Sequence, residues 1–330
     1  MGSLVCQCRN SPIFIVVQRR DRSVCFFCVE WFFDYLTFLR EKAQTGTVSV
    51  KYFYLRRAFR LLPAISVFFM VIAAMMYLGW LSPAWKSLLI AVFYLYNFVP
   101  GRYYFSELGH TWSLGVEEQF YLLWPWAIRW VAAPGLPLVL GILLVACIVA
   151  PFLLPGIVFD WNGKQYVFAR FFWDLQRFFI PAIAPVILGG YAAWLYLYSG
   201  KIRLISQRGG LLPSALILFS AQLLLPETVF AHFPPYLFKG AGASLALLHI
   251  AYHQEGGLAR LLEWRPLAWL GSISYGVYVW QGLFLRTGPG GRLWIQQFPQ
   301  NVVLTLLAAI LSYYLLEKHF LHWKKRFSPH

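Results

Sequence analysis

The chain has 330 residues, of which 59% are hydrophobic and only 12% are charged, and its formal net charge is +15. An average soluble domain carries about 25% charged residues, so this chain has too little polar surface for a soluble globule. The basic residues lie between long apolar runs, where Lys and Arg orient a membrane protein; this argues against nucleic-acid binding. The cysteines include one Cys25-x-x-Cys28 pair with no second pair and no nearby His, so no metal site is expected.

Apolar runs recur from residue 61 to the end of the chain. A helix needs about 20 apolar residues to cross a bilayer. The sequence therefore predicts an all-α, polytopic transmembrane helix bundle with about nine membrane segments. The expected segments are 61–81, 87–101, 113–132, 137–159, 180–200, 209–226, 240–254, 266–285 and 301–316.

The distribution of Lys and Arg predicts the orientation of these segments. Residues 40–60 hold six Lys or Arg, residues 201–208 hold three and residues 318–326 hold four. These stretches and the C-terminus are therefore expected on the cytoplasmic side. Five segments before residue 200 give the wrong parity for this arrangement, so residues 87–101, a run of only 15, are expected not to cross.

Residues 166–179 have a different pattern. Arg170, Asp174 and Arg177 recur at i, i+4 and i+7 and would share one face of a helix, while Phe and Trp would cover the other. This pattern predicts an interfacial helix outside the membrane core.

The strongest polar cluster is the sequence HTWSLGVEEQFY, which begins at His110. An ionisable group in a membrane segment is costly and needs a functional or pairing reason. His110 is a candidate general base, and Glu117 and Glu118 lie about two helical turns further on. We expect these three residues to be catalytic. The alternative is an N-terminal capping cluster with Thr111 or Ser113 as the cap.

A second cluster, FYLRRAFRLLP, places Arg57 and Arg60 three residues apart on one helix face. Guanidinium groups suit phosphates. A phosphate-bearing donor such as a coenzyme A thioester would fit there, and ordinary positive-inside anchoring is the alternative.

A third cluster, GSISYGVYVWQ, places Ser274, Tyr278 and Gln281 on one polar stripe of a spanning helix. Hydrogen bonds between helices would explain the stripe. The more specific interpretation is a lined substrate pocket.

In this order, the three clusters and the tail EKHFLHWKKRF resemble the acyltransferase-3 family of membrane O-acyltransferases, over about 37–327. The resemblance implies a core of roughly ten helices. It also implies transfer of an acyl group, often acetyl, from cytosolic acyl-CoA to a hydroxyl of an extracytoplasmic carbohydrate or glycolipid. Acyl-CoA, expected to be acetyl-CoA, is then a co-substrate, with no permanently bound cofactor and no metal.

The resemblance also implies roles for individual residues. Arg57 and Arg60 match the family's Arg-x-x-Arg pair and would hold the donor phosphates. His110, Glu117 and Glu118 would orient or polarise the reacting groups. The expected substrate pocket comprises Trp112, Ser113, Tyr121, Ser274, Tyr275, Tyr278 and Gln281.

The N-terminal segment departs from the family pattern. The family's proposed catalytic His lies on its first membrane helix, but no His precedes His110 here. Residues 1–36 do not resemble the two helices expected there, and a one-base shift of the codons for residues 22–35 can encode a family-like helix. The hypothesis is that 1–36 is a frameshifted segment before a membrane acyltransferase domain (37–327) and a short tail (328–330). The chain as written would then lack an essential His and be inactive.

Two other functional classes remain open from the sequence, a transporter without chemistry and a catalytically dead scaffold in envelope assembly. The expected partners are the lipid bilayer and a carbohydrate or glycolipid acceptor. The expected location is the bacterial inner membrane. The sequence leaves the oligomeric state open.

Overall fold

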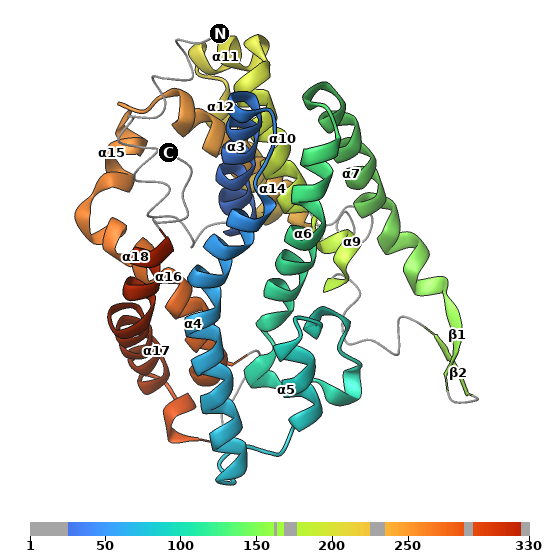
Figure 1. Ribbon diagram of the computed structural model, residues 1–330, viewed down its shortest axis with the longest axis vertical. Helices are drawn as coiled ribbons and strands as arrows, with labels where there is room; N and C mark the ends of the chain where they lie inside the picture. The colour runs from blue at the N-terminus through green and yellow to red at the C-terminus, as the bar shows by residue number, and fades with distance from the viewer. Residues whose placement is uncertain (1–25, 162–163, 168–176, 225–234, 287–292, 325–330) are drawn as a thin grey trace. The chain divides into compact units, whose positions relative to one another are not determined.

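The computed structural model describes residues 26–161, 164–167, 177–224, 235–286 and 293–324. These residues are almost entirely helical, which confirms the predicted fold class apart from one small hairpin (Figure 1). The chain forms two compact units. Unit 1 comprises Met1–Val48, Pro125–Val149 and Ile183–Ser272, and unit 2 comprises Ser49–Trp124, Ala150–Ala182 and Ile273–His330.

Unit 1 is built from helices that bury aromatic and small side chains against one another. Helix α3 packs on α10 and α14, and α14 packs in turn on α12. Trp31, Tyr35 and Phe38 are buried and recur every three or four residues, so they form the inner face of α3. A helix that begins at Phe26 is not among the sequence predictions. The helices wholly or mainly in unit 1 are α3 (Phe26–Thr45), α7 (Leu136–Leu153), α10 (Ala184–Tyr198), α11 (Gly200–Gln207), α12 (Leu211–Leu224), α14 (Pro235–Tyr252) and α15 (Gly257–Glu263), with the turn η4 (Ala133–Gly135).

Lys42 joins α3 to the end of α6 within unit 1. Its ammonium group donates to the carbonyl oxygens of Ile128 and of Val131, the latter at 2.7 Å. The last carbonyls of a helix have no partner within the helix, and the negative end of the helix dipole attracts a cation placed there. Lys42 therefore caps the C-terminal end of α6.

Unit 2 contains two long helices that run antiparallel. Helix α4 runs from a basic start to an apolar end. Helices α17 and α18 and the π-helical turn η8 between them form one continuous helix in the opposite direction. Phe59 on α4 lies against Phe320 and Trp323 near the end of that helix, with ring centroids 6.3 and 6.4 Å apart. The elements of unit 2 are α4 (Val50–Tyr77), α5 (Trp85–Val92), η1 (Tyr96–Phe98), η2 (Gly101–Tyr103), η3 (Ser106–Leu108), η5 (Leu154–Gly156), β1 (Val158–Trp161), β2 (Lys164–Val167), α9 (Phe179–Ala182), η7 (Trp294–Gln296), α17 (Gln300–Ser312), η8 (Tyr313–Glu317) and α18 (Lys318–Lys324); α6 (Thr111–Trp130) and α16 (Arg265–Phe284) contribute to both units.

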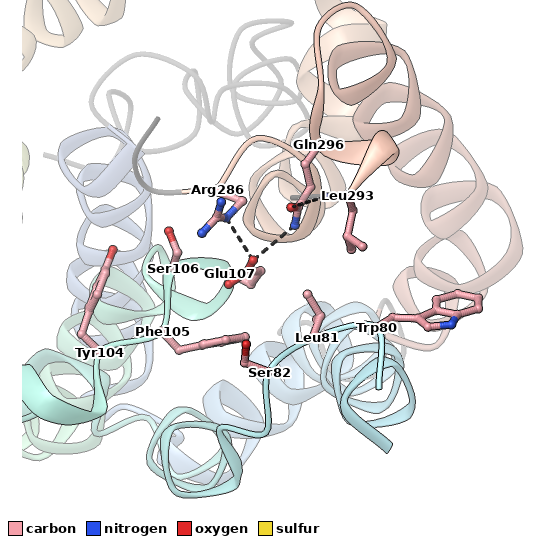
Figure 2. Close-up of a pocket in the computed structure, with 10 residues that line it drawn as sticks. All are labelled: Trp80, Leu81, Ser82, Tyr104, Phe105, Ser106, Glu107, Arg286, Leu293 and Gln296. Atoms are coloured by element: carbon pink, nitrogen blue, oxygen red, sulfur yellow. Dashed lines mark hydrogen bonds and ion pairs between the residues drawn. The ribbon is translucent and has the colours of Figure 1, made fainter. Parts of the chain in front are cut away.

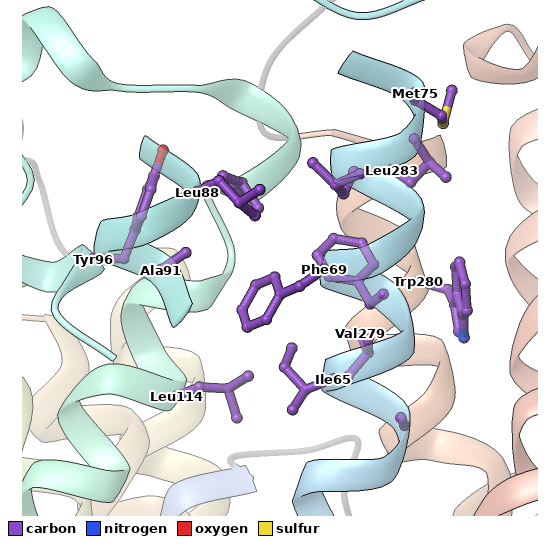
Figure 3. Close-up of a cluster of buried hydrophobic side chains, with 14 of the residues drawn as sticks. Ile65, Phe69, Met75, Leu88, Ala91, Tyr96, Leu114, Val279, Trp280 and Leu283 are labelled. Carbon is purple, nitrogen blue, oxygen red and sulfur yellow. The ribbon is translucent and has the colours of Figure 1, made fainter. Parts of the chain in front are cut away.

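The core of unit 2 lies where α4, α5, α16 and the first turns of α6 meet (Figure 3). Phe69 on α4, Leu114 on α6 and Val279 on α16 belong to this cluster of buried side chains. The buried hydroxyl of Tyr275 donates to the carbonyl of Leu61 at 2.8 Å, which ties α16 to α4. These contacts fix the three helices that carry most of the predicted site residues.

Fewer helices than expected are long and apolar enough to cross a membrane. In the described part of the chain there are two, Val50–Tyr77 and Gln300–Trp323. A third results if Gly200–Gln207 and Leu211–Ala221, bent by 87°, form one broken span. The expected nine spans are therefore not reached, although each of the nine predicted segments overlaps a helix.

Local breaks explain why several of these helices are short. At the end of α10 the hydroxyl of Ser199 accepts a hydrogen bond from the Ile202 amide, so a new helix starts there. Gly209 then has a φ of +74°, in the left-handed region that ends helices. Periodicity and hydropathy do not reveal such breaks, and they merge short helices into longer predicted segments.

Two further segments can be compared with their predictions. Residues 87–101, expected not to cross, contain the end of the eight-residue helix α5 followed by 3-10 turns. The prediction of an interfacial helix at 166–179 is wrong at its start, because residues 164–167 pair with residues 158–161 in an antiparallel hairpin. Residues 168–176 of that segment lie outside the described residues.

Substituting Gly190 tests the packing of α10 on α3. A Cβ at Gly190 would lie 2.6 Å from Nε1 of Trp31, a rigid buried side chain, so Gly190→Ala is expected to lower the free energy of unfolding by about 1–3 kcal/mol. The matched control is Gly141→Ala on α7, where nothing lies within 4 Å; it should be neutral or slightly stabilising. Thermal unfolding in detergent compares the two variants, and equal midpoints would contradict this packing.

Candidate functional site

The predicted site residues on α6 are held by hydrogen bonds at its start. Thr111 Oγ1 donates to the carbonyl of Leu108 at 2.7 Å, and Ser113 Oγ donates to the carbonyl of His110 at 3.2 Å. Helix α6 begins at Thr111, so Thr111 and Ser113 are its first and third residues and neither occupies the N-cap position. The capping alternative for Thr111 and Ser113 is therefore not what the structure contains.

Arg57 on α4 pairs with both predicted glutamates of α6. Its Nη2 lies 2.7 Å from Oε1 of Glu117 and 2.6 Å from Oε1 of Glu118. The side chains of Arg57 and Glu117 are only 7% and 3% exposed, so neither charge is solvated. The Tyr121 ring lies 3.3 Å from the Arg57 guanidinium carbon, which adds a cation–π contact. The structure thus joins two predicted catalytic residues and one predicted phosphate ligand in one buried ion cluster.

The remaining polar residues of the EEQFY element also have defined partners. Gln119 Nε2 donates to Asn97 Oδ1 at 2.9 Å, and Asn97 Nδ2 donates back to Gln119 Oε1 at 3.1 Å. One turn earlier, a Cβ at Gly115 would lie 2.6 Å from the carbonyl oxygen of Tyr94. The amide pair and the glycine together hold the 94–97 turn against α6.

A second polar group surrounds the start of α6. The hydroxyl of Tyr278 on α16 donates to the His110 carbonyl at 2.5 Å and also contacts Ser113 Oγ. These contacts place His110, Ser113 and Tyr278 next to one another. They form a group separate from the Arg57 cluster, so His110 does not share a hydrogen bond with either glutamate.

The imidazole of His110 is buried among apolar rings. Its centroid lies 5.3 Å from that of Phe68 and 5.4 Å from that of Tyr278. Burial lowers the pKa of His110 well below its usual 6.5; backbone carbonyls of Glu107 and Val279 oppose that shift. Neither ring nitrogen completes a hydrogen bond of ordinary geometry within the described residues. The ring is therefore neutral at neutral pH, because burial disfavours its charged form.

Gly282 on α16 provides the space for this ring. A Cβ at that position would overlap the imidazole of His110 and would lie 2.5 Å from the carbonyl of Glu107. No sequence signal marks a glycine inside a helix as part of a site, so the prediction missed it.

The other predicted pocket residues have more ordinary surroundings. Trp112 is partly buried, with the guanidinium of Arg177 5.1 Å from its ring. Tyr275 is a packing residue, and Ser274 and Gln281 are partly buried on α16. Arg60 is also partly buried and lies one turn after Arg57.

A pocket of about 360 Å³ in unit 2 contains residues that the sequence did not single out (Figure 2). Arg286 Nε lies 3.0 Å from Oε1 of Glu107, and Gln296 Nε2 donates to the same oxygen at 3.2 Å. Glu107 lies three residues before His110 and outside the predicted apolar segment 113–132, so it was not among the predicted site residues. Nothing in the local sequence indicates that two distant residues converge on it.

Comparisons with known proteins identify the family of the chain. The family model described as an acyltransferase domain, Acyl_transf_3, matches residues 13–317. The chain belongs to the acyltransferase-3 family. This confirms the predicted family and, with it, the predicted enzyme class, an acyltransferase for groups other than amino-acyl groups.

Curated relatives of this acyltransferase-3 protein are named as O-acetyltransferases of bacteria. It is 25% identical over 291 residues to the peptidoglycan O-acetyltransferase OatA of Listeria monocytogenes, covering 77% of this chain and 43% of that protein. It is also 25% identical over 229 residues to the putative peptidoglycan O-acetyltransferase YrhL of Bacillus subtilis, covering 64% and 34% respectively. The chain thus spans less than half of the length of either relative. No solved structure matches.

The family match covers most of the N-terminal segment but does not test its reading frame. It begins at residue 13, and residues 26–36 belong to helix α3. The frameshift hypothesis for 1–36 stays a prediction, and so does the inactivity expected from the missing first-helix His, which the transfer assay proposed below tests directly. Residues 1–25 lie outside the described residues.

Removing Arg57 tests the ion cluster in this acyltransferase-3 protein. Arg57→Gln removes the cation that pairs with both of these neighbouring carboxylates, which is expected to cost about 3–5 kcal/mol of stability. Adding Glu117→Gln should restore part of that loss, because the more buried of the two carboxylates is then neutral. Arg260→Gln, at an exposed position of α15, should change stability by less than about 0.5 kcal/mol. Thermal unfolding measures all three, and a double variant no more stable than Arg57→Gln would contradict the pairing.

Proposed function

We propose that the chain is a membrane O-acyltransferase that moves an acetyl group from acetyl-CoA to a hydroxyl of a cell-surface carbohydrate. The relatives named for peptidoglycan make that polymer the first acceptor to test. The observation that carries the proposal is the position of His110, a buried imidazole seated in the space left by Gly282. It is the only buried histidine among the described residues.

The reaction needs a group that accepts one proton. The acceptor hydroxyl attacks the thioester carbonyl, the new ester bond forms, and the carbon–sulfur bond breaks to release the coenzyme A thiol. A general base within reach of the hydroxyl takes its proton and passes it to the leaving sulfur. We assign that role to His110, and the adjacent hydroxyls of Ser113 and Tyr278 keep its backbone in place.

The donor phosphates require basic groups that a ligand can reach from the surface. Arg57 is occupied by Glu117 and Glu118, so we assign it a positioning role that sets α4 against α6. Lys51 is exposed and Arg56 and Arg60 are partly exposed on the same end of α4. We propose that this basic end receives the acyl-CoA, with Arg60 as the phosphate ligand of the predicted pair.

The orientation follows from the two candidate spans. The basic start of α4 lies beside α18, whose Lys318 is exposed, as the Phe59 and Phe320 contact indicates. Loops rich in Lys and Arg face the cytoplasm. We therefore place these ends and the C-terminus in the cytoplasm of a bacterial cell, with the protein in its inner membrane.

Replacing His110 tests the general base. His110→Gln keeps a polar side chain of similar size but cannot take the proton, so acetyl transfer should fall by about 100-fold or more. The matched control is the same change at an exposed position of α18, His319→Gln, which should transfer acetyl normally. Membranes that contain the full chain are given radiolabelled acetyl-CoA and peptidoglycan fragments, and label in the glycan is counted. Transfer that survives in His110→Gln would remove His110 from catalysis, and glycan uptake without release of coenzyme A would favour a transporter.

Filling the space beside the His110 imidazole should also lower acetyl transfer. Gly282→Ala adds a methyl group where the His110 ring lies, so the ring must move, and transfer is expected to fall by at least about tenfold, because a misplaced group costs that much or more. Gly101→Ala, with nothing within 4 Å, is the control. Full activity of Gly282→Ala in the same membrane assay would mean that this ring position is not needed.

A further inference from the structure

The pocket around Glu107 lies at the opposite end of the two long helices from their basic residues. Trp80 and Leu81 follow the end of α4, and Leu293 and Gln296 precede the start of α17. These four residues line the pocket together. If the basic ends are cytoplasmic, as proposed above, the pocket is at the extracytoplasmic end of unit 2.

The pocket has a buried polar floor and an exposed rim. Glu107 and Gln296 are 4% and 6% exposed, whereas Trp80 is 62% exposed and Ser82 is also exposed. Figure 2 shows Arg286 and Gln296 pointing toward Glu107 from the far side of the pocket, with Tyr104 and Trp80 at its two edges. Its volume of about 360 Å³ is within the range of small-molecule sites, about 300–1,000 Å³.

The floor is suited to a ligand with several hydroxyl groups. A carboxylate only accepts hydrogen bonds, a guanidinium only donates them, and an amide does both. Glu107, Arg286 and Gln296 bring these three planar groups to one place, where neighbouring hydroxyls of a sugar can each donate and accept. The partly buried rings of Tyr104 and Phe105 add apolar surface for the C–H face of a sugar ring.

The charge of the floor excludes the acyl donor. Glu107 and Arg286 form an ion pair, so their formal charges cancel. A phosphate group would meet the Glu107 carboxylate next to a guanidinium that is already paired. The floor therefore suits a neutral polyhydroxylated ligand and not the phosphates of coenzyme A.

The pocket is also close to the proposed general base. Glu107 precedes His110 by three residues, and the space at Gly282 is bounded by both the His110 ring and the Glu107 carbonyl. We infer that this pocket binds the carbohydrate acceptor, with Glu107, Arg286 and Gln296 holding sugar hydroxyls and Glu107 as a positioning residue for the reacting one. The inference rests on the proposed function for the role of the sugar, but sugar binding can be measured without any transfer.

The test measures binding and transfer separately. The full chain in detergent is titrated with a soluble β-1,4-linked oligomer of N-acetylglucosamine and, separately, with coenzyme A, by isothermal titration calorimetry. Glu107→Gln removes the ion pair while keeping the shape, and should weaken sugar binding by about 10-fold or more, as expected for loss of a hydrogen bond to a charged group. Ser82→Trp places a large side chain at the exposed rim and should block the sugar without disturbing the buried floor. Binding of coenzyme A should be the same in both variants as in the unchanged chain.

Controls and transfer kinetics separate the possible outcomes. Glu255→Gln and Arg260→Gln, at exposed positions outside unit 2, should bind the oligomer normally. In the transfer assay Ser82→Trp should raise the KM for glycan more than it lowers kcat. An unchanged chain that binds no oligomer, or an oligomer affinity that Ser82→Trp leaves intact, overturns the pocket assignment. If the oligomer binds through the pocket but no chain transfers acetyl, the proposed function fails while the carbohydrate site remains.

Discussion

A guanidinium and two carboxylates buried between apolar helices are costly to separate, and this constraint organises unit 2. Breaking such a group leaves a charge with neither water nor a partner. Arg57 therefore fixes the position of α4 against Glu117 and Glu118 on α6. Tyr54, one turn earlier, reinforces the same contact, because its hydroxyl donates to the Leu122 carbonyl at 2.9 Å. With α6 held at this point, its first turn is placed where His110 meets α16.

Polar groups then follow one another along the start of α6. Glu107 lies in the pocket, His110 and Ser113 meet Tyr278, and Glu117 meets Arg57. From Glu107 to Glu117 the chain rises on the order of 15–20 Å, given the rise per residue of 3-10 and α-helices. That is roughly half of the hydrocarbon thickness of a bilayer. Under the proposed function, the donor end, the general base and the acceptor pocket lie along one short segment, so one helix sets all three positions.

The sequence predicts the polar residues of the site better than their partners. Ionisable groups are rare in or beside apolar segments, and this marks His110, Glu117 and Arg57 as candidate site residues in the sequence. Their pairing was not predictable, since Arg57 and Glu117 are 60 residues apart and a guanidinium serves a phosphate and a carboxylate equally well. Gln296 is 189 residues from Glu107, and neither belongs to a marked motif. The helices were predictable from apolar runs. Their ends depend on single residues such as Ser199 and Gly209, so the number of helices long enough to cross a membrane was not predictable.

The two ends of unit 2 differ in charge in a way that would sort two substrates. Coenzyme A carries phosphates, and the start of α4 offers the exposed Lys51 with Arg56 and Arg60 nearby. The pocket offers Glu107 and Arg286, whose charges cancel. A phosphate gains Coulomb energy at the first end and meets a carboxylate at the second, whereas the second offers a neutral sugar both donors and acceptors of hydrogen bonds. Under the proposed function, this difference in charge would disfavour binding of the donor at the pocket without a moving barrier, and the direction of transfer would follow from where each substrate can bind.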